Sequence, residues 1–145
     1  MQIGEIMNRN VTTIKEGTTL KEAAEILHHS MASDLMVVND AGEFVGVLSE
    51  GDVVREIMPK YEGFMLSSGN LYEAFGMFIE EGAEKAGRSV DPLVIRDPIT
   101  FASSDDALKA AATMVSRQIR RLPVVDDGAL VGTLSRADVA YAVLK

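Results

Sequence analysis

Apolar side chains in the N-terminal third of the chain follow first a helical and then an extended spacing. Between residues 19 and 30 they recur every three to four positions, which predicts an amphipathic helix with Thr18 as its N-cap. Two β-branched runs follow at residues 36–38 and 44–48, separated by an Asn-Asp-Ala-Gly turn at 39–42, and they predict a β-hairpin. The apolar positions of the helix are Leu20, Ala23, Ala24, Ile26 and Leu27.

The same pattern returns in the C-terminal third, where Asp106 would cap a helix and a turn at residues 126–128 would join two strands. The corresponding positions are Val11 with Ile99, Leu35 with Leu122, and Gly46 with Gly132. The separation shortens by one residue twice, each time where a loop or a helix end is expected. The order and type of residues are kept through all three blocks, so the chain contains an internal repeat.

Each copy reads as strand, helix, strand, strand and helix, which predicts an α/β (α+β) fold of two βαββα units. One unit of about 50 residues would be marginally stable alone. We therefore expect the copies to pack face to face around a shared core, with pseudo-two-fold symmetry. The expected boundaries are residues 1–59 for the first repeat, 60–89 for a helical insert and 90–145 for the second repeat.

The insert predicts a further helix from Asn70 to Ala86, with Asn70 and Glu73 at its cap and Gly87 as its stop. Its apolar stripe consists of Leu71, Ala74, Phe75, Phe78 and Ile79, widened by Tyr72 and Met77. We expect this stripe to cover the shared core, and a dimer surface or a lid over a cleft remain the alternatives.

Composition restricts the function of the chain. The net charge of −8 opposes broad binding to nucleic acid, because neutralising phosphates needs a basic surface. No apolar stretch approaches the length of a bilayer span, and the N-terminus lacks the pattern of a secretory signal. The absence of cysteine excludes disulfides and thiolate metal sites. We expect a cytoplasmic protein that binds neither membranes nor nucleic acid.

The repeat resembles the CBS (cystathionine-β-synthase-like) domain. The resemblance rests on Leu-Pro-Val-Val-Asp at residues 122–126, on the glycine-containing hairpins, and on Gly-x-x-Ser-x-x-Asp beginning at Gly46 and Gly132. It covers residues 3–59 and 90–145 and departs at Met36, where the family often has proline. It implies a tandem pair that binds adenosine nucleotides, with aspartate on the ribose, serine near the phosphate, and adenine beside the first two strands.

The Ser-x-x-Asp elements, Ser49 with Asp52 and Ser135 with Asp138, have two compatible interpretations. Each forms a capping box at a helix N-terminus, or each offers donors to a phosphate and an acceptor to a ribose. The resemblance places the favoured ligand site at Ile99, Thr100, Phe101, Arg120, Arg121, Leu122, Pro123, Gly132, Ser135, Arg136 and Asp138. It places the weaker site at Val11, Thr12, Thr13, Asp34, Leu35, Met36, Gly46, Ser49 and Asp52.

Charge distinguishes the two sites. Arg120, Arg121 and Arg136 surround the second element, whereas Asp34 and Glu50 stand at matching places in the first. Arginine binds two phosphate oxygens with its planar fork, so the second site is the better candidate for a phosphorylated nucleotide, AMP above all. One alternative ligand is S-adenosylmethionine or adenosine, of which the cationic S-adenosylmethionine suits the acidic first site. Another alternative is a ligand-free dimerisation module.

No catalytic or metal site is expected. Glu25, His28 and His29 share part of a helix, but such residues usually form a solvated face. Neither Ser49 nor Ser135 lies in a G-x-S-x-G nucleophile elbow. We therefore expect a regulatory sensor that needs no cofactor, is not an enzyme, forms a homodimer and acts on an effector protein that the sequence does not identify.

Overall fold

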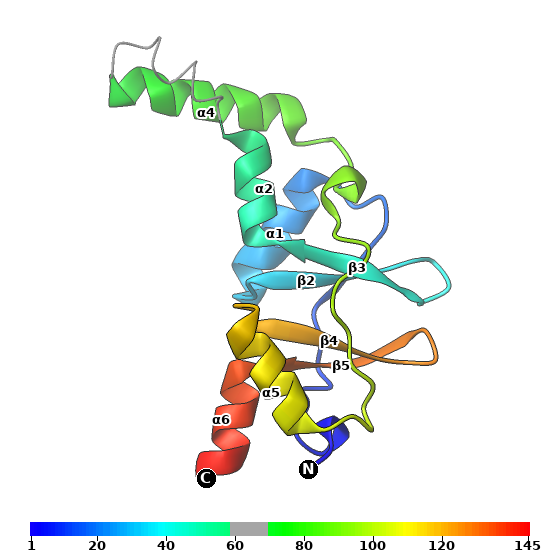
Figure 1. The fold of residues 1–145 in the computed structure, drawn as a ribbon. Coiled ribbons are helices and arrows are strands. Elements are labelled where there is room, and N and C mark those ends of the chain that lie inside the picture. The colour runs from blue at the N-terminus through cyan, green and yellow to red at the C-terminus, as the bar shows by residue number, and fades with distance from the viewer. Residues whose placement is uncertain (59–69) are drawn as a thin grey trace.

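The computed structural model describes residues 1–58 and 70–145, and it confirms two βαββα repeats (Figure 1). The first repeat contains β1 (Thr13–Lys15), α1 (Leu20–Ser30), β2 (Asp34–Val38), β3 (Phe44–Ser49) and α2 (Glu50–Ile57). Its three strands lie in the order β1-β2-β3, with β1 parallel and β3 antiparallel to β2.

The second repeat contains α5 (Ala107–Ser116), β4 (Arg121–Asp126), β5 (Ala129–Ser135) and α6 (Arg136–Leu144). Its first strand is reduced to a single bridge between Phe101 and Val124. In the first repeat, the Met36 N–H donates to the Thr12 carbonyl at 3.2 Å. Proline has no N–H, so Pro123 at the corresponding position cannot make this bond, and the strand is shortened.

The helix caps agree with the sequence at Asp106 and Asn70 but not at Thr18. Asp106 accepts from the Leu108 N–H at 2.8 Å, and Asn70 accepts from the Tyr72 N–H at 3.0 Å. The prediction for Thr18 was wrong by one residue, because Thr19 forms the capping box with Glu22. The Thr18 hydroxyl instead donates to the Lys15 carbonyl at 2.7 Å.

The two repeats exchange their leading segments. Ile3 and Met7, in the short 3-10 turn Ile3–Glu5 and just after it, pack into the core of the second repeat beside Met114 and Leu134. Val90 and Val94, around the second 3-10 turn (Asp91–Leu93), pack into the core of the first repeat. Each repeat thus completes its core with residues that precede the other, and neither core is built from one continuous segment.

Backbone pairing fixes this exchange. Asn8 and Thr133 exchange two backbone hydrogen bonds of 2.8 and 2.9 Å, and Val47 and Ile95 exchange two of 3.0 and 2.9 Å. Each leading segment therefore pairs with the second strand of the hairpin in the opposite repeat. The equivalence of the two pairs gives the chain its pseudo-two-fold symmetry.

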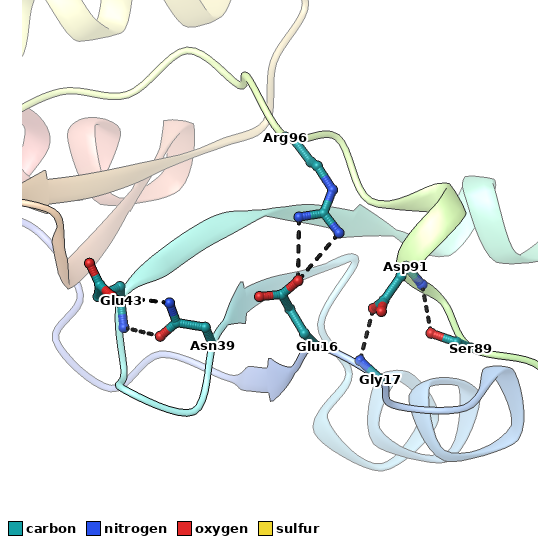
Figure 2. A network of polar contacts seen from close by, with 7 residues as sticks. All are labelled: Glu16, Gly17, Asn39, Glu43, Ser89, Asp91 and Arg96. Carbon is teal, nitrogen blue, oxygen red and sulfur yellow. Dashed lines mark hydrogen bonds and ion pairs between the residues drawn. The ribbon is translucent and has the colours of Figure 1, made fainter.

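Polar contacts also hold the second leading segment against the first repeat (Figure 2). The Gly17 N–H donates to the Asp91 carboxylate at 2.8 Å, and the Asp91 N–H donates to the Ser89 hydroxyl at 3.1 Å. Arg96 forms an ion pair with Glu16 at 3.4 Å, but both side chains are substantially exposed, so the pair adds little stability. The backbone ladder and the buried valines carry most of the anchoring.

Helix α4 (Leu71–Lys85) lies across the end of α2, away from the sheets (Figure 1). The Lys85 ammonium attaches it to α2 by donating to the Glu56 carbonyl at 2.7 Å. The expectation that its apolar stripe covers the shared core is wrong, because among its residues only Ala74 is buried. The exposed large side chains are Leu71, Tyr72, Phe75 and Ile79, at 80, 88, 65 and 59%. Within the described residues, no helix is long and apolar enough to cross a membrane.

Candidate ligand-binding clefts

Two clefts lie at the junction of the repeats. The first, of about 280 Å³, is lined by Asn8, Asn10, Val11, Thr12, Ser30, Met31, Ala32, Asp34, Met36, Arg121 and Thr133. The second, of about 320 Å³, is lined by Asp34, Val47, Ile95, Pro98, Ile99, Gln118, Ile119, Arg120, Arg121, Leu122 and Pro123. Most members of one set have a repeat-related counterpart in the other, so the two clefts are equivalent positions of one pseudo-symmetric fold.

The structure brings together only part of each predicted site. In the first cleft, the predicted residues along the wall are Val11, Thr12, Asp34 and Met36. In the second cleft, they are Ile99, Arg120, Arg121, Leu122 and Pro123. Among the others, Leu35 is fully buried in the core, because strand alternation turns it away from Asp34 and Met36. Neither Thr13, Thr100 nor Phe101 is among the lining residues.

Sequence reasoning missed the residues that the pairing of each leading segment with the opposite hairpin brings into the clefts. Asn8 and Thr133 reach the first cleft, and Ile95 and Val47 reach the second. These are the residues paired by the exchanged segments. The glycines Gly46 and Gly132 were the one available signal, since a glycine inside a strand marks a close approach.

The close approach at both glycines is made by backbone. A Cβ at Gly132 would lie 2.8 Å from the Asn8 carbonyl oxygen. A Cβ at Gly46 would collide with the Ile95 carbonyl and lie 2.8 Å from a Val94 methyl group. The exchanged segments therefore account for glycine at both positions without a ligand.

Both Ser-x-x-Asp elements form capping boxes, as one of the two interpretations predicted. The Asp138 N–H donates to the Ser135 hydroxyl at 3.0 Å, and the Ser135 N–H donates to the Asp138 carboxylate at 2.8 Å. Across the hairpins Ser49 pairs with Asp34 and Ser135 pairs with Arg121, two residues that line the clefts. The four predicted residues Ser49, Asp52, Ser135 and Asp138 are themselves not among the lining residues of either cleft.

The two aspartates differ in their remaining partners. Arg55 forms an ion pair with Asp52. Burial raises the pKa of Asp52, but hydrogen bonds from Ser49 and Arg55 outweigh this effect, so the pKa lies below its ordinary value. The position of Arg55 is taken by Tyr141 in the second repeat. Within the described residues, the second carboxylate oxygen of Asp138 has no hydrogen-bond or ion-pair partner.

The charges are distributed differently from the sequence prediction. Asp34 and Arg121 line both clefts, and Arg120 lines only the second. Arg136 is exposed and is not among the lining residues of either cleft. The Arg121 guanidinium donates to the Thr133 hydroxyl at 2.9 Å, and Thr133 lines only the first cleft. One of the three arginines assigned to the second site is therefore directed toward the first.

A third cavity lies among α1, α2 and α4, outside the clefts. It has a volume of about 340 Å³, and its wall includes Leu20, Val53 and Ile57, with His28 and His29 also contributing. Within residues 1–58 and 70–145, no group of three or more histidine, aspartate and glutamate side chains has the arrangement of a metal site.

Two equivalent clefts between two βαββα repeats define a paired-repeat fold. A family model for the CBS domain matches residues 3–59 and 90–145, and the chain belongs to this family as a tandem pair. It is 32% identical over 156 residues to MJ1426 of Methanocaldococcus jannaschii, covering 99% of this chain and 92% of that protein.

Two solved structures are informative about ligands. The structure of CBSX2 in complex with AMP superposes with a TM-score of 0.73 at 27% identity, covering 99% of this chain and 96% of that one. CBSX2 is a protein of Arabidopsis thaliana. The CBS pair of MJ0100 in complex with 5′-methylthioadenosine and S-adenosyl-L-methionine superposes with a TM-score of 0.70, covering 99% of this chain and 95% of that one. Its 19% identity shows the fold alone.

Several relatives are longer than this chain. The chain spans 40% of MJ1225 of Methanocaldococcus jannaschii, 63% of chloroplastic CBSX2 and 25% of a homoserine O-acetyltransferase of Methanohalophilus mahii. CBS pairs of this kind therefore also occur as parts of larger proteins, enzymes included.

Proposed function

We propose that the chain is a regulatory module that binds an adenosine-containing nucleotide, with AMP as the first candidate, in the second cleft. The observation that carries this proposal is the combination of an apolar wall with a cationic end. Ile99, Ile119 and Pro123 offer a surface for a purine, while Arg120 and Arg121 offer donors to a phosphate. The free carboxylate oxygen of Asp138 suits a ribose hydroxyl.

The chemistry of the clefts favours sensing over catalysis. The only two histidines, His28 and His29, lie on α1 and are not among the lining residues of either cleft. No nucleophile there has a neighbouring imidazole base, so the proposed function requires no reaction and no cofactor. A ligand would act by favouring one conformation or one protein partner over another.

The first cleft favours a second class of ligand. Its wall is more polar, with Asn8, Asn10 and Thr12 contributing, and it includes Asp34. Arg121 is its only cation among the described lining residues. A neutral or cationic adenosyl compound such as S-adenosylmethionine therefore fits it better than a nucleotide with several phosphates. The AMP bound by CBSX2 supports an adenosine-containing ligand for this chain.

Thermal unfolding with AMP, ADP, ATP and S-adenosylmethionine tests the proposal. A ligand at about 100 times its Kd stabilises the native state by about 2.7 kcal/mol, which raises the Tm by several degrees in a chain of this size. We expect AMP to raise the Tm, and calorimetry to give its stoichiometry. If none of the four ligands changes the Tm, the clefts do not bind adenosyl compounds, and the alternative of a ligand-free interaction module takes precedence.

We also propose that the chain forms a homodimer through the exposed side of α4. Phe75 is 65% exposed and stacks on Phe78, and the neighbouring apolar side chains are exposed as well. Light scattering is expected to give twice the 15.7 kDa chain mass. Phe75→Asp should shift the protein toward the monomer, whereas Leu108→Asp, at an exposed site on α5, should leave the mass unchanged. A wild-type particle of the single-chain mass would contradict the dimer.

A further inference from the structure

Two oppositely charged side chains belong to both clefts at once. Asp34 and Arg121 line the first cleft and also the second. They stand at equivalent places in the two repeats, because Asp34 pairs with the capping residue Ser49 and Arg121 pairs with the capping residue Ser135. The pseudo-two-fold symmetry therefore brings them to the junction between the clefts, where one side chain can serve either cavity.

The two clefts differ in the number of cationic residues on their walls. Within the described residues, Arg121 is the only cation on the wall of the first cleft, whereas the second cleft also has Arg120. In the structure Arg121 is held toward the first cleft by its 2.9 Å hydrogen bond to Thr133. The residue corresponding to Thr133 is Val47, which lines the second cleft and offers no hydroxyl. Arg121 thus has a polar anchor on one side of the junction only.

We propose that Arg121 is a shared phosphate-binding residue that couples the two clefts, so that a phosphorylated nucleotide in one disfavours a phosphorylated nucleotide in the other. This inference rests on the proposed function. A phosphate that engages Arg121 leaves the opposite cleft with the Asp34 carboxylate and without this arginine. A second phosphate would meet two negative charges in a partly buried site, where salt screens them weakly. A neutral adenosine would meet no such penalty.

The coupling has a predictable size and direction. Coupling between two sites in one protein is commonly about 5-fold to 150-fold in affinity, and it acts equally in both directions. We expect the second AMP to bind at least about fivefold more weakly than an isolated cleft would bind it. Adenosine should fill the remaining cleft of the AMP-bound chain with less than about twofold loss.

Single-cleft variants allow this coupling to be measured by calorimetry. Val11→Trp fills part of the first cleft only and Ile99→Trp part of the second only, so each variant reports the AMP affinity of the other cleft. The two variants give the AMP association constants of the separate clefts, and the wild type gives the constants for its first and second AMP. The ratio of the product of the first pair to the product of the second pair is the coupling factor. The same comparison in an Arg121→Ala background should give a factor near one. Arg120→Ala is the matched control, because it removes a cation from the second cleft only and should leave the coupling in place.

Thr133→Val provides a second test that keeps Arg121. It removes the anchor in the first cleft and places there the side chain found at Val47. We expect it to raise the AMP affinity of the second cleft, measured with Val11→Trp, and to lower that of the first, measured with Ile99→Trp. Unchanged affinities in both clefts would contradict the shared role.

The proposal and the function on which it rests fail differently. Two AMP molecules that bind the wild type independently, or a coupling factor that survives Arg121→Ala, would overturn the sharing of Arg121 while leaving nucleotide binding intact. The absence of any AMP binding to the wild type would overturn the proposed nucleotide site itself.

Discussion

Replacing Asp138 by asparagine is expected to weaken AMP binding by about tenfold or more. Loss of a hydrogen bond to a charged group costs about 1.5–3 kcal/mol, and one pair of ribose hydroxyls would lose its ionised acceptor. Asparagine retains a carbonyl oxygen that can accept from the Ser135 N–H, a bond of 2.8 Å in the structure. The helix cap should therefore persist, and calorimetry should report a change in affinity with little change in Tm.

Two comparisons make this result specific. Asp52→Asn should change the affinity for the first AMP by less than about twofold, since Asp52 is already engaged by Arg55. In the wild type, 2′-deoxy-AMP should bind about as weakly as AMP binds the Asp138→Asn variant. Equal affinities for AMP and 2′-deoxy-AMP would contradict the role of Asp138 in binding the ribose. A loss of AMP affinity that is larger in Asp52→Asn than in Asp138→Asn would contradict it as well.

Replacing Gly46 by alanine is expected to lower the free energy of unfolding by about 1–3 kcal/mol, the usual cost of adding atoms to a well-packed site. The added methyl group would collide with the Ile95 carbonyl and press on Val94. To avoid this collision, the segment around Ile95 would have to move away and break its two hydrogen bonds to Val47. These bonds hold the exchanged segment in place. Urea unfolding, monitored by circular dichroism, measures the change.

Gly76→Ala is the matched control for this substitution. Gly76 lies within α4, and a Cβ there would meet no atom within 4 Å. Alanine favours a helix over glycine by about 0.5–1 kcal/mol, so this variant should be slightly more stable than the wild type. A Gly46→Ala variant as stable as the wild type would show that the exchanged segment can move without cost. The close packing at Val94 and Ile95 would then contribute little to the free energy of unfolding.

The two clefts of this symmetric fold differ in charge. The pseudo-two-fold places Asp34 opposite Arg121, so the symmetry of the backbone is kept while the symmetry of charge is broken. A phosphate and a cationic adenosyl group could then occupy different clefts of one chain. Asp34 and Arg121 line both clefts, so Arg120, which lines only the second, makes the difference in charge between them.

The sequence by itself determined the repeat, the order of elements in each copy and most helix caps. These features depend on neighbouring residues: apolar spacing defines a helix or a strand, and Asn70 or Asp106 caps a helix through an N–H two residues away. The capping boxes at Ser49 and Ser135 follow from the same local geometry. The shortening of the first strand in the second repeat was not predicted, although its cause, the missing N–H of Pro123, is visible in the sequence.

The tertiary structure alone decided which repeat each leading segment completes, which side chains meet in each cleft and where α4 lies. Ile3 and Val90 read simply as apolar residues before a strand, yet each is buried in the core of the opposite repeat. The sharing of Arg121 by both clefts follows from the pairing of Asn8 with Thr133 and of Ile95 with Val47. Such contacts join residues far apart in the chain, and local spacing carries no information about the path that brings them together.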